Sequence, residues 1–318
     1  MSKILITILI MSHMTSCLNS EKTIPLPVAI DSHAIAYEWN DALWLLINRF
    51  SEQKTHVYKV TQDYEIALVS KLSMMSSTAS SCDDQLIITG SNSVGKPIII
   101  AINVEGKEIW NHVLSDITPI TWPVTACGGE LLLAWQESTD TLEVGSLNTK
   151  TNEFKRNSQI KVETPPLTLF AWKNYMHSIW LDNKQIHLTD VSKNEKSLIE
   201  RNGDYADNFT VGIADDNLYY AWATKDHVSL KFSEEKKTQS VPVENASGGD
   251  IIAVSGKEPL IWSQRADMDM DENIIWKSVL VIPEKEIYNI NEYVYAVSWW
   301  HDKIVVVHPN RLSILQKK

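Results

Sequence analysis

Four of the five arginines could bind an anion, because they fall on or beside predicted loops that share one face of the molecule. They are Arg49, Arg201, Arg265 and Arg311. The planar guanidinium group presents paired N–H donors that fit a carboxylate bidentately. The residues therefore predict either an anion-binding patch or arginines that are solvated at loop ends.

Three aspartates alternate along the segment DMDMDEN (267–273): Asp267, Asp269 and Asp271. Oxygen ligands at this spacing suit Ca²⁺, as in calcium-binding loops. Such loops then need a glycine for their sharp turn, and Glu272 stands in its place. The segment indicates either a calcium site or a hydrated acidic loop, and the sequence indicates no other cofactor.

Cys82 and Cys127 occupy the same place in two neighbouring copies of a sequence repeat described below. A disulfide between them requires Cα atoms within about 7 Å and an oxidising compartment. Buried free thiols are the alternative, since unpaired cysteines are often part of a core.

The first 17 residues, MSKILITILIMSHMTSC, are typical of a secretion signal. The apolar run at 4–11 is shorter than the roughly 20 residues that cross a bilayer as a helix. MTSC (14–17) resembles the bacterial lipobox, in which the chain is cut before a cysteine that is then acylated. This resemblance implies a lipoprotein signal peptide at 1–16, a lipid on Cys17 and a short tether at 17–21.

The residue after the cysteine is Leu18 and not the aspartate that retains such lipoproteins at the inner membrane. The resemblance therefore implies a bacterial cell-envelope protein, anchored by lipid to the outer membrane. An ordinary secretory peptide or an uncleaved tail remains the alternative.

The overall composition excludes some classes of function. A net charge of −11 argues against nucleic acid, which requires a basic surface. The sequence contains no Gly-x-Ser-x-Gly, His-Glu-x-x-His or phosphate-binding loop motif. Twelve tryptophans and ten tyrosines suit half-buried sheet positions, where the ring packs and its polar edge finds a partner.

The candidate residues are positioned by a repeat whose copies start 43, 45, 45, 42, 41 and 45 residues apart. Each copy combines a strand end, a two-residue turn and the start of an apolar run: WNDAL (39–43), CDDQL (82–86), CGGEL (127–131), WKNYM (172–176), ADDNL (214–218), SGKEP (255–259) and WHDKI (300–304). The turn pairs are rich in Asn, Asp and Gly, which tolerate the positive φ that tight hairpins need. We therefore expect seven tight hairpins.

Further strand patterns follow each hairpin, giving four strands in about 43 residues, which is typical of propeller blades. The seventh copy supplies three strands, and a surplus apolar run at 22–30 precedes the first copy. We predict an all-β, seven-bladed β-propeller of four-stranded antiparallel blades at 22–318, in which 22–30 pairs with the last blade at 291–316. Closure of the ring removes the open sheet edge. The alternative fold is a solenoid built of the same hairpins.

The stretch LYYAW…VSLKFSEEKKTQSVPV (218–243) resembles the sialidase-like, or Asp-box, propellers, with Ser233, Glu235 and Thr238 at the turn. The corresponding turn NVEGKEIW (103–110) equally resembles quinoprotein-type blades. The Asp-box resemblance implies that three arginines could clamp a substrate carboxylate, with Arg49, Arg265 and Arg311 as the candidates. No matching Tyr/Glu nucleophile pair can be assigned.

These patterns favour a non-enzymatic, lipid-anchored propeller that binds a protein or glycan partner in the cell envelope and is itself a monomer. The alternative is a sialidase-like, glycan-active enzyme that uses the arginine-bearing face. A calcium-dependent secreted module is a third hypothesis. Because propellers carry many functions on one scaffold, the fold does not choose among these roles.

Overall fold

The computed structural model describes most of the chain after its N-terminal segment. The described residues are 20–127, 130–161, 168–173, 175–182, 185–191, 193, 195–201, 209–235, 237–244, 246, 249–269, 273–283 and 286–316. The predicted signal peptide at 1–16, Cys17, most of the predicted tether and Asp271 lie outside them. So does the side chain of Arg201, whose backbone ends a described strand.

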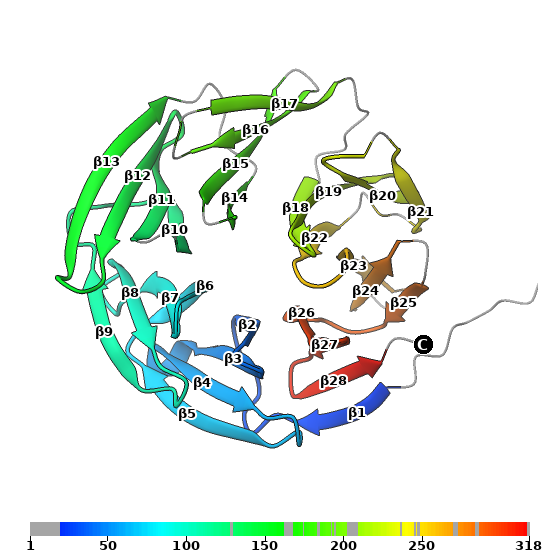
Figure 1. The fold of residues 1–318 in the computed structure, drawn as a ribbon. Helices are drawn as coiled ribbons and strands as arrows, with labels where there is room; N and C mark the ends of the chain where they lie inside the picture. Colours follow the sequence, from blue (N-terminus) through cyan, green and yellow to red (C-terminus); the bar gives the residue numbers. More distant parts are fainter. Residues whose placement is uncertain are drawn as a thin grey trace, which may run out of the picture.

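Seven four-stranded antiparallel sheets form a closed ring around a central axis (Figure 1). The strands of the first four blades, from the axis outward, are β2 (Ala34–Trp39), β3 (Ala42–Arg49), β4 (Lys54–Val60) and β5 (Ile66–Leu72); β6 (Met75–Cys82), β7 (Gln85–Ser91), β8 (Pro97–Ile102) and β9 (Glu108–Val113); β10 (Thr121–Cys127), β11 (Leu131–Ser138), β12 (Thr141–Asn148) and β13 (Glu153–Lys161); and β14 (Thr168–Trp172), β15 (Tyr175–Asp182), β16 (Gln185–Asp190) and β17 (Glu195–Arg201).

The other three blades follow the same order from the axis outward. They contain β18 (Phe209–Ala214), β19 (Asn217–Thr224), β20 (His227–Phe232) and β21 (Gln239–Pro242); β22 (Asp250–Val254), β23 (Leu260–Met268), β24 (Ile274–Ile282) and β25 (Glu286–Ile290); and β26 (Ala296–Trp300), β27 (Lys303–Val307), β28 (Arg311–Gln316) and β1 (Ser20–Pro25). A short 3₁₀ helix, Phe50–Glu52, links β3 to β4. The predicted seven-bladed propeller is confirmed.

Among the described residues, no helix has both the length and the apolar character needed to cross a membrane.

The second strand of a blade is mostly buried and apolar in its first half because neighbouring blades cover both of its faces. In β3, seven successive residues from Ala42 to Asn48 are buried. The outermost strand β9 instead has mainly exposed and half-exposed side chains. The core is therefore a set of layers between blades, which explains why these strands read as continuous apolar runs.

The hairpin between the first and second strand of a blade points to one side of the ring, which we call the hairpin-tip face. Its turns have the positive φ expected of tight hairpins, for example 51° and 58° at Asn40 and Asp41, and 47° and 61° at Asp215 and Asp216. The opposite side, which carries the second-to-third strand loops and the links between blades, we call the loop face.

The two-residue turn predicted in the sixth copy is wrong. β22 ends at Val254 and β23 begins at Leu260, so the connection is the longer loop 255–259. The backbone of Gly256 pairs with the neighbouring blade, donating to the Ile213 carbonyl at 2.8 Å and accepting from Asp215 N–H at 3.1 Å. Pro259 also has no N–H to offer to a hairpin ladder.

The N-terminal strand completes the seventh blade, as predicted, although its bounds differ. Ser20–Pro25 pairs antiparallel with β28, so the first and last strands of the chain lie side by side at the rim (Figure 1). The strand ends at Pro25, before Pro27, because proline cannot donate to a ladder. The chain beyond stays attached through Leu26 N–H to the Asn310 carbonyl at 2.9 Å.

Among the closing-strand side chains that the structure describes (22–25), that of Ile24 enters the core between the seventh and first blades. Ile24 is 7% exposed and packs in a cluster with Leu45, Trp300, Leu312 and Ile314. Closure is therefore stabilised by apolar packing as well as by backbone hydrogen bonds.

Replacing Ile24 with alanine should lower the free energy of unfolding by about 2–4 kcal/mol, through lost apolar burial and a residual cavity. Urea denaturation followed by tryptophan fluorescence measures the change. Thr23→Ala is the matched control, because Thr23 lies on the exposed face of the same strand, and it should cost less than about 0.5 kcal/mol. Equal losses in the two variants would contradict the packing of this strand.

Candidate functional site

A cavity of about 1010 Å³ follows the axis and is lined mainly by the innermost strands of four blades. These strands are β2, β18, β22 and β26, and β6 adds Ser77. A pocket of this size, open to solvent and combining apolar and polar groups, is the usual form of a binding site. The cavity is the candidate functional site.

Its mouth on the hairpin-tip face is acidic. Asp215 and Asp216 form the tip between β18 and β19, and both side chains are exposed. Within the described part of the chain, neither carboxylate has a hydrogen-bond or ion-pair partner. Lys257 lies at the same mouth, on the loop that follows β22.

Backbone contacts with both neighbouring blades hold this acidic tip in place. Besides the Gly256 contact, the indole N–H of Trp172 donates to the Asp216 carbonyl at 2.9 Å. Gly256 has no room for a side chain, since a Cβ there would lie 2.0 Å from Cδ1 of Trp299. The two free carboxylates are therefore presented by a constrained turn.

Across the mouth, Glu38 of β2 is already paired. Its Oε1 accepts from the His301 backbone N–H at 3.0 Å and lies 3.3 Å from Nδ1 of the same residue. This contact joins the first and seventh blades. The Glu38 carboxylate thus serves partly as a link in the ring.

The mouth on the loop face is aromatic. Tyr293 and Tyr295 line it, with their rings edge to face at 4.7 Å. Asp250, at the start of β22, and His33 lie at the same mouth. Burial lowers the pKa of His33, which keeps its imidazole neutral at neutral pH.

The cavity lining therefore carries a surplus of negative charge. Its carboxylates are Glu38, Asp215, Asp216 and Asp250, against the single ammonium group of Lys257. A charged cleft with low-dielectric walls focuses its field and attracts ligands of opposite sign. The arrangement suits a cationic ligand better than an anionic one.

The predicted anion-binding arginines whose side chains the structure describes, Arg49, Arg265 and Arg311, do not line this cavity, and each lies near a carboxylate. Arg49 donates to the Ala29 carbonyl at 2.6 Å and lies 3.7 Å from Glu52. Arg311 pairs with Glu292, which also lies 3.0 Å from Nδ1 of His308. Burial lowers the pKa of His308, and the Glu292 charge opposes that shift.

Arg265 is similarly engaged. Its Nε lies 3.2 Å from Asp267, and its guanidinium group also donates to the Glu244 carbonyl. Arg265 and Lys277 line a separate hollow of about 310 Å³ between the fifth and sixth blades. An incoming carboxylate would have to displace these partners, so the described arginines do not form a free three-arginine clamp.

The two described aspartates of the predicted calcium loop are bonded to protein donors. Asp267 lies 2.7 Å from Lys277 Nζ, a hydrogen bond that lowers the pKa of its carboxyl group. Asp269 accepts from the Asn273 backbone N–H at 2.8 Å. The third predicted ligand, Asp271, lies outside the described residues, so the calcium site stays a prediction.

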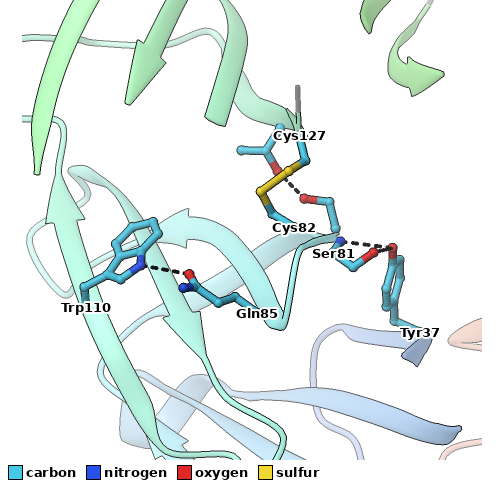
Figure 2. Close-up of a disulfide and its surroundings, with 8 residues drawn as sticks. Tyr37, Ser81, Cys82, Gln85, Trp110 and Cys127 are labelled. Carbon is cyan, nitrogen blue, oxygen red and sulfur yellow. Dashed lines mark hydrogen bonds between the residues drawn. A yellow bond between two sulfur atoms is a disulfide. The ribbon is translucent and has the colours of Figure 1, made fainter. Parts of the chain in front are cut away.

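Cys82 and Cys127 form a disulfide that joins the second and third blades (Figure 2). Their Cα atoms are 5.2 Å apart, because both residues end an innermost strand at the same level of the ring. Next to it, the hydroxyls of Ser80 and Thr125 are 2.5 Å apart and connect the same strands. Among the described residues, the one close grouping of potential metal ligands is these cysteines with Asp83, and the disulfide occupies both thiols.

Reasoning from the sequence treated Asp215 and Asp216 as turn residues and did not single out Tyr293 or Tyr295. The sequence does contain a pattern that indicates part of this site. In a propeller the first strand of each blade lines the axis, so acidic residues at the ends of those strands share one mouth. That rule marks Glu38 and the Asp215–Asp216 tip as candidates, but it also marks Asp41 and Asp302, which do not line the cavity.

The closed ring of four-stranded blades around an open axial cavity places the chain in the class of seven-bladed β-propellers. No protein-family model matches the chain, and no curated protein matches its sequence.

Similar solved structures include WD40 propellers. U3-55K is 8% identical, with a TM-score of 0.58, over 93% of this chain and 98% of that one. The WD40 domain of SCAP from fission yeast is 10% identical, with a TM-score of 0.53, over 93% and 98% of the two chains. A chain of the mitotic checkpoint complex is 11% identical, with a TM-score of 0.58, over 99% of both. Identities this low establish the fold alone.

Replacing Cys82 and Cys127 together with serine should lower the free energy of unfolding by about 4 kcal/mol, because the disulfide closes a 45-residue segment. Urea denaturation with and without reductant measures the effect. Reductant should shift the midpoint of the unmodified protein toward that of the double variant, whose own midpoint should not move. Insensitivity of the unmodified protein to reductant would contradict a stabilising disulfide.

Proposed function

We propose that this chain is a non-enzymatic, lipid-anchored propeller of the bacterial cell envelope that binds a protein partner at its axial cavity. One observation carries the binding role: a large cavity on a closed scaffold, with polar side chains such as Asp215 and Asp216 left free to bind. A rigid scaffold that presents unpaired groups has little left to reorganise when a partner docks, which favours affinity.

The geometry supports binding over glycan chemistry. Arg49, Arg265 and Arg311 are each paired within the protein, and none lines the axial cavity. The sialidase-like alternative depends on free guanidinium groups that converge on one substrate carboxylate. A protein partner requires no such convergence.

The similar structures also support a protein-binding role. One of them is a chain of the mitotic checkpoint complex, so a propeller of this shape takes part in a protein assembly there. The others are U3-55K and the WD40 domain of SCAP. Protein binding is the role that we carry over to this chain as part of the proposal.

The position at which the chain joins the ring determines which side of the propeller a lipid anchor on Cys17 would hold near the membrane. Ser20 pairs with Leu315, which lies opposite Ile304 and so close to the hairpin tip of the seventh blade. Two residues, each at most about 3.5 Å long, separate Cys17 from the start of β1. A lipid on Cys17 would therefore hold the hairpin-tip side of this rim next to the membrane.

Replacing Cys17 with alanine should abolish incorporation of an alkyne-tagged palmitate and move the protein from the detergent phase to the aqueous phase in Triton X-114 partition. The Cys82→Ser/Cys127→Ser variant is the control and should keep both the label and the detergent partition. Labelling that survives in Cys17→Ala would contradict the anchor.

The binding role is tested by a photo-crosslinking amino acid placed at Ile252, which lines the cavity and is 44% exposed. Irradiation of cells should give one dominant crosslinked protein, identified by mass spectrometry. The same amino acid at Val113, on the rim strand β9 and 39% exposed, is the control. Identical adducts from both positions, or none from Ile252, would contradict binding at the cavity.

A further inference from the structure

We infer that the axial cavity receives a basic peptide segment of the protein partner, whose lysine or arginine side chains pair with Asp215 and Asp216. This inference rests on the proposed binding role and specifies the chemistry of the partner. It does not depend on the lipid anchor.

The negative charge of the cavity lining favours a basic ligand. Four carboxylates line the cavity against one lysine, and burial keeps His33 neutral. Apolar residues such as Ile35 and Ile252 form part of the wall. Carboxylates beside an apolar wall are less screened than those on an open surface, so they select a cationic ligand more strongly.

The two tip carboxylates are also unpaired within the described residues, which favours a cationic ligand. In the described part of the structure, Asp215 and Asp216 have no side-chain partner, while Glu38 is paired with His301. Their turn is held by the Gly256 and Trp172 contacts on its two sides. The free carboxylates are therefore positioned before any ligand arrives.

The spacing of the carboxylates argues for a peptide over a metal ion. In the described residues, none of the cavity carboxylates belongs to a group of three or more potential ligands close enough to hold one ion. Separate carboxylates along a cavity of about 1010 Å³ suit separate cations carried on long side chains. The aromatic residues Tyr293 and Tyr295 add faces on which an ammonium or guanidinium group can lie.

Other acidic hairpin tips provide matched controls. Asp41 and Asp302 are exposed tip residues on the same face, and neither lines the cavity. Replacing either pair with asparagine removes two negative charges and keeps a residue that tolerates tight turns. The two double variants have the same net charge and differ in whether the lost carboxylates face the cavity.

The test measures binding of fluorescein-labelled pentalysine to the full-length protein, purified in a neutral detergent, by fluorescence anisotropy. Asp215→Asn/Asp216→Asn should weaken binding about tenfold, which corresponds to loss of two partly exposed ion pairs. Asp41→Asn/Asp302→Asn should change the affinity by less than about twofold. Unchanged melting temperatures establish that both variants are folded.

A second variant tests the interior of the cavity without removing any carboxylate. Ile252→Lys places a cation within the lining and should also weaken pentalysine binding about tenfold or more, through like-charge repulsion. Labelled pentaglutamate should not bind the unmodified protein.

Three results would overturn the inference: no binding of pentalysine, equal losses in the two aspartate double variants, or full binding by Ile252→Lys. Equal losses in the two double variants would attribute the attraction to net charge alone. If Ile252 still crosslinks a protein in cells under those results, the binding role stands and the basic peptide is the wrong ligand.

Discussion

Closure of the ring is the constraint on which the rest of the structure depends. Second strands such as β3 have apolar residues on both faces, which can be buried only between two neighbouring blades. An open ring would expose such a face at each end, together with an unpaired strand edge. Pairing of β1 with β28 removes both exposures, so the two ends of the described chain stabilise every blade between them.

Closure is reinforced along the hairpin-tip face by a different contact at each of several junctions. These contacts are Tyr37 with Ser81, the Cys82–Cys127 disulfide, Trp172 with Asp216, Gly256 with Asp215 and Ile213, Trp299 with Glu258, and Glu38 with His301. The one covalent contact joins the second and third blades (Figure 2). These contacts hold the rim of the cavity mouth, which keeps its unpaired carboxylates in a fixed arrangement.

The candidate site was less predictable than the fold because its residues come from different repeats. The expected anion patch at Arg49, Arg265 and Arg311 assumed that arginines on one face act together. In the folded chain each meets an acidic residue close to its own loop, such as Glu52, Asp267 or Glu292. The acidic cavity mouth instead combines Glu38 of the first blade with Asp215 and Asp216 of the fifth.

The amino-acid sequence alone was enough to predict the number of blades, most hairpin turns and the pairing of the first strand with the last blade. These features depend on neighbouring residues and on a repeat of about 43 residues. It also marked Cys82 and Cys127 as equivalent positions. Folding in three dimensions decided which carboxylates stay unpaired, how Gly256 reaches the next blade and where a cavity opens. Those outcomes depend on distances between blades, which no local pattern encodes.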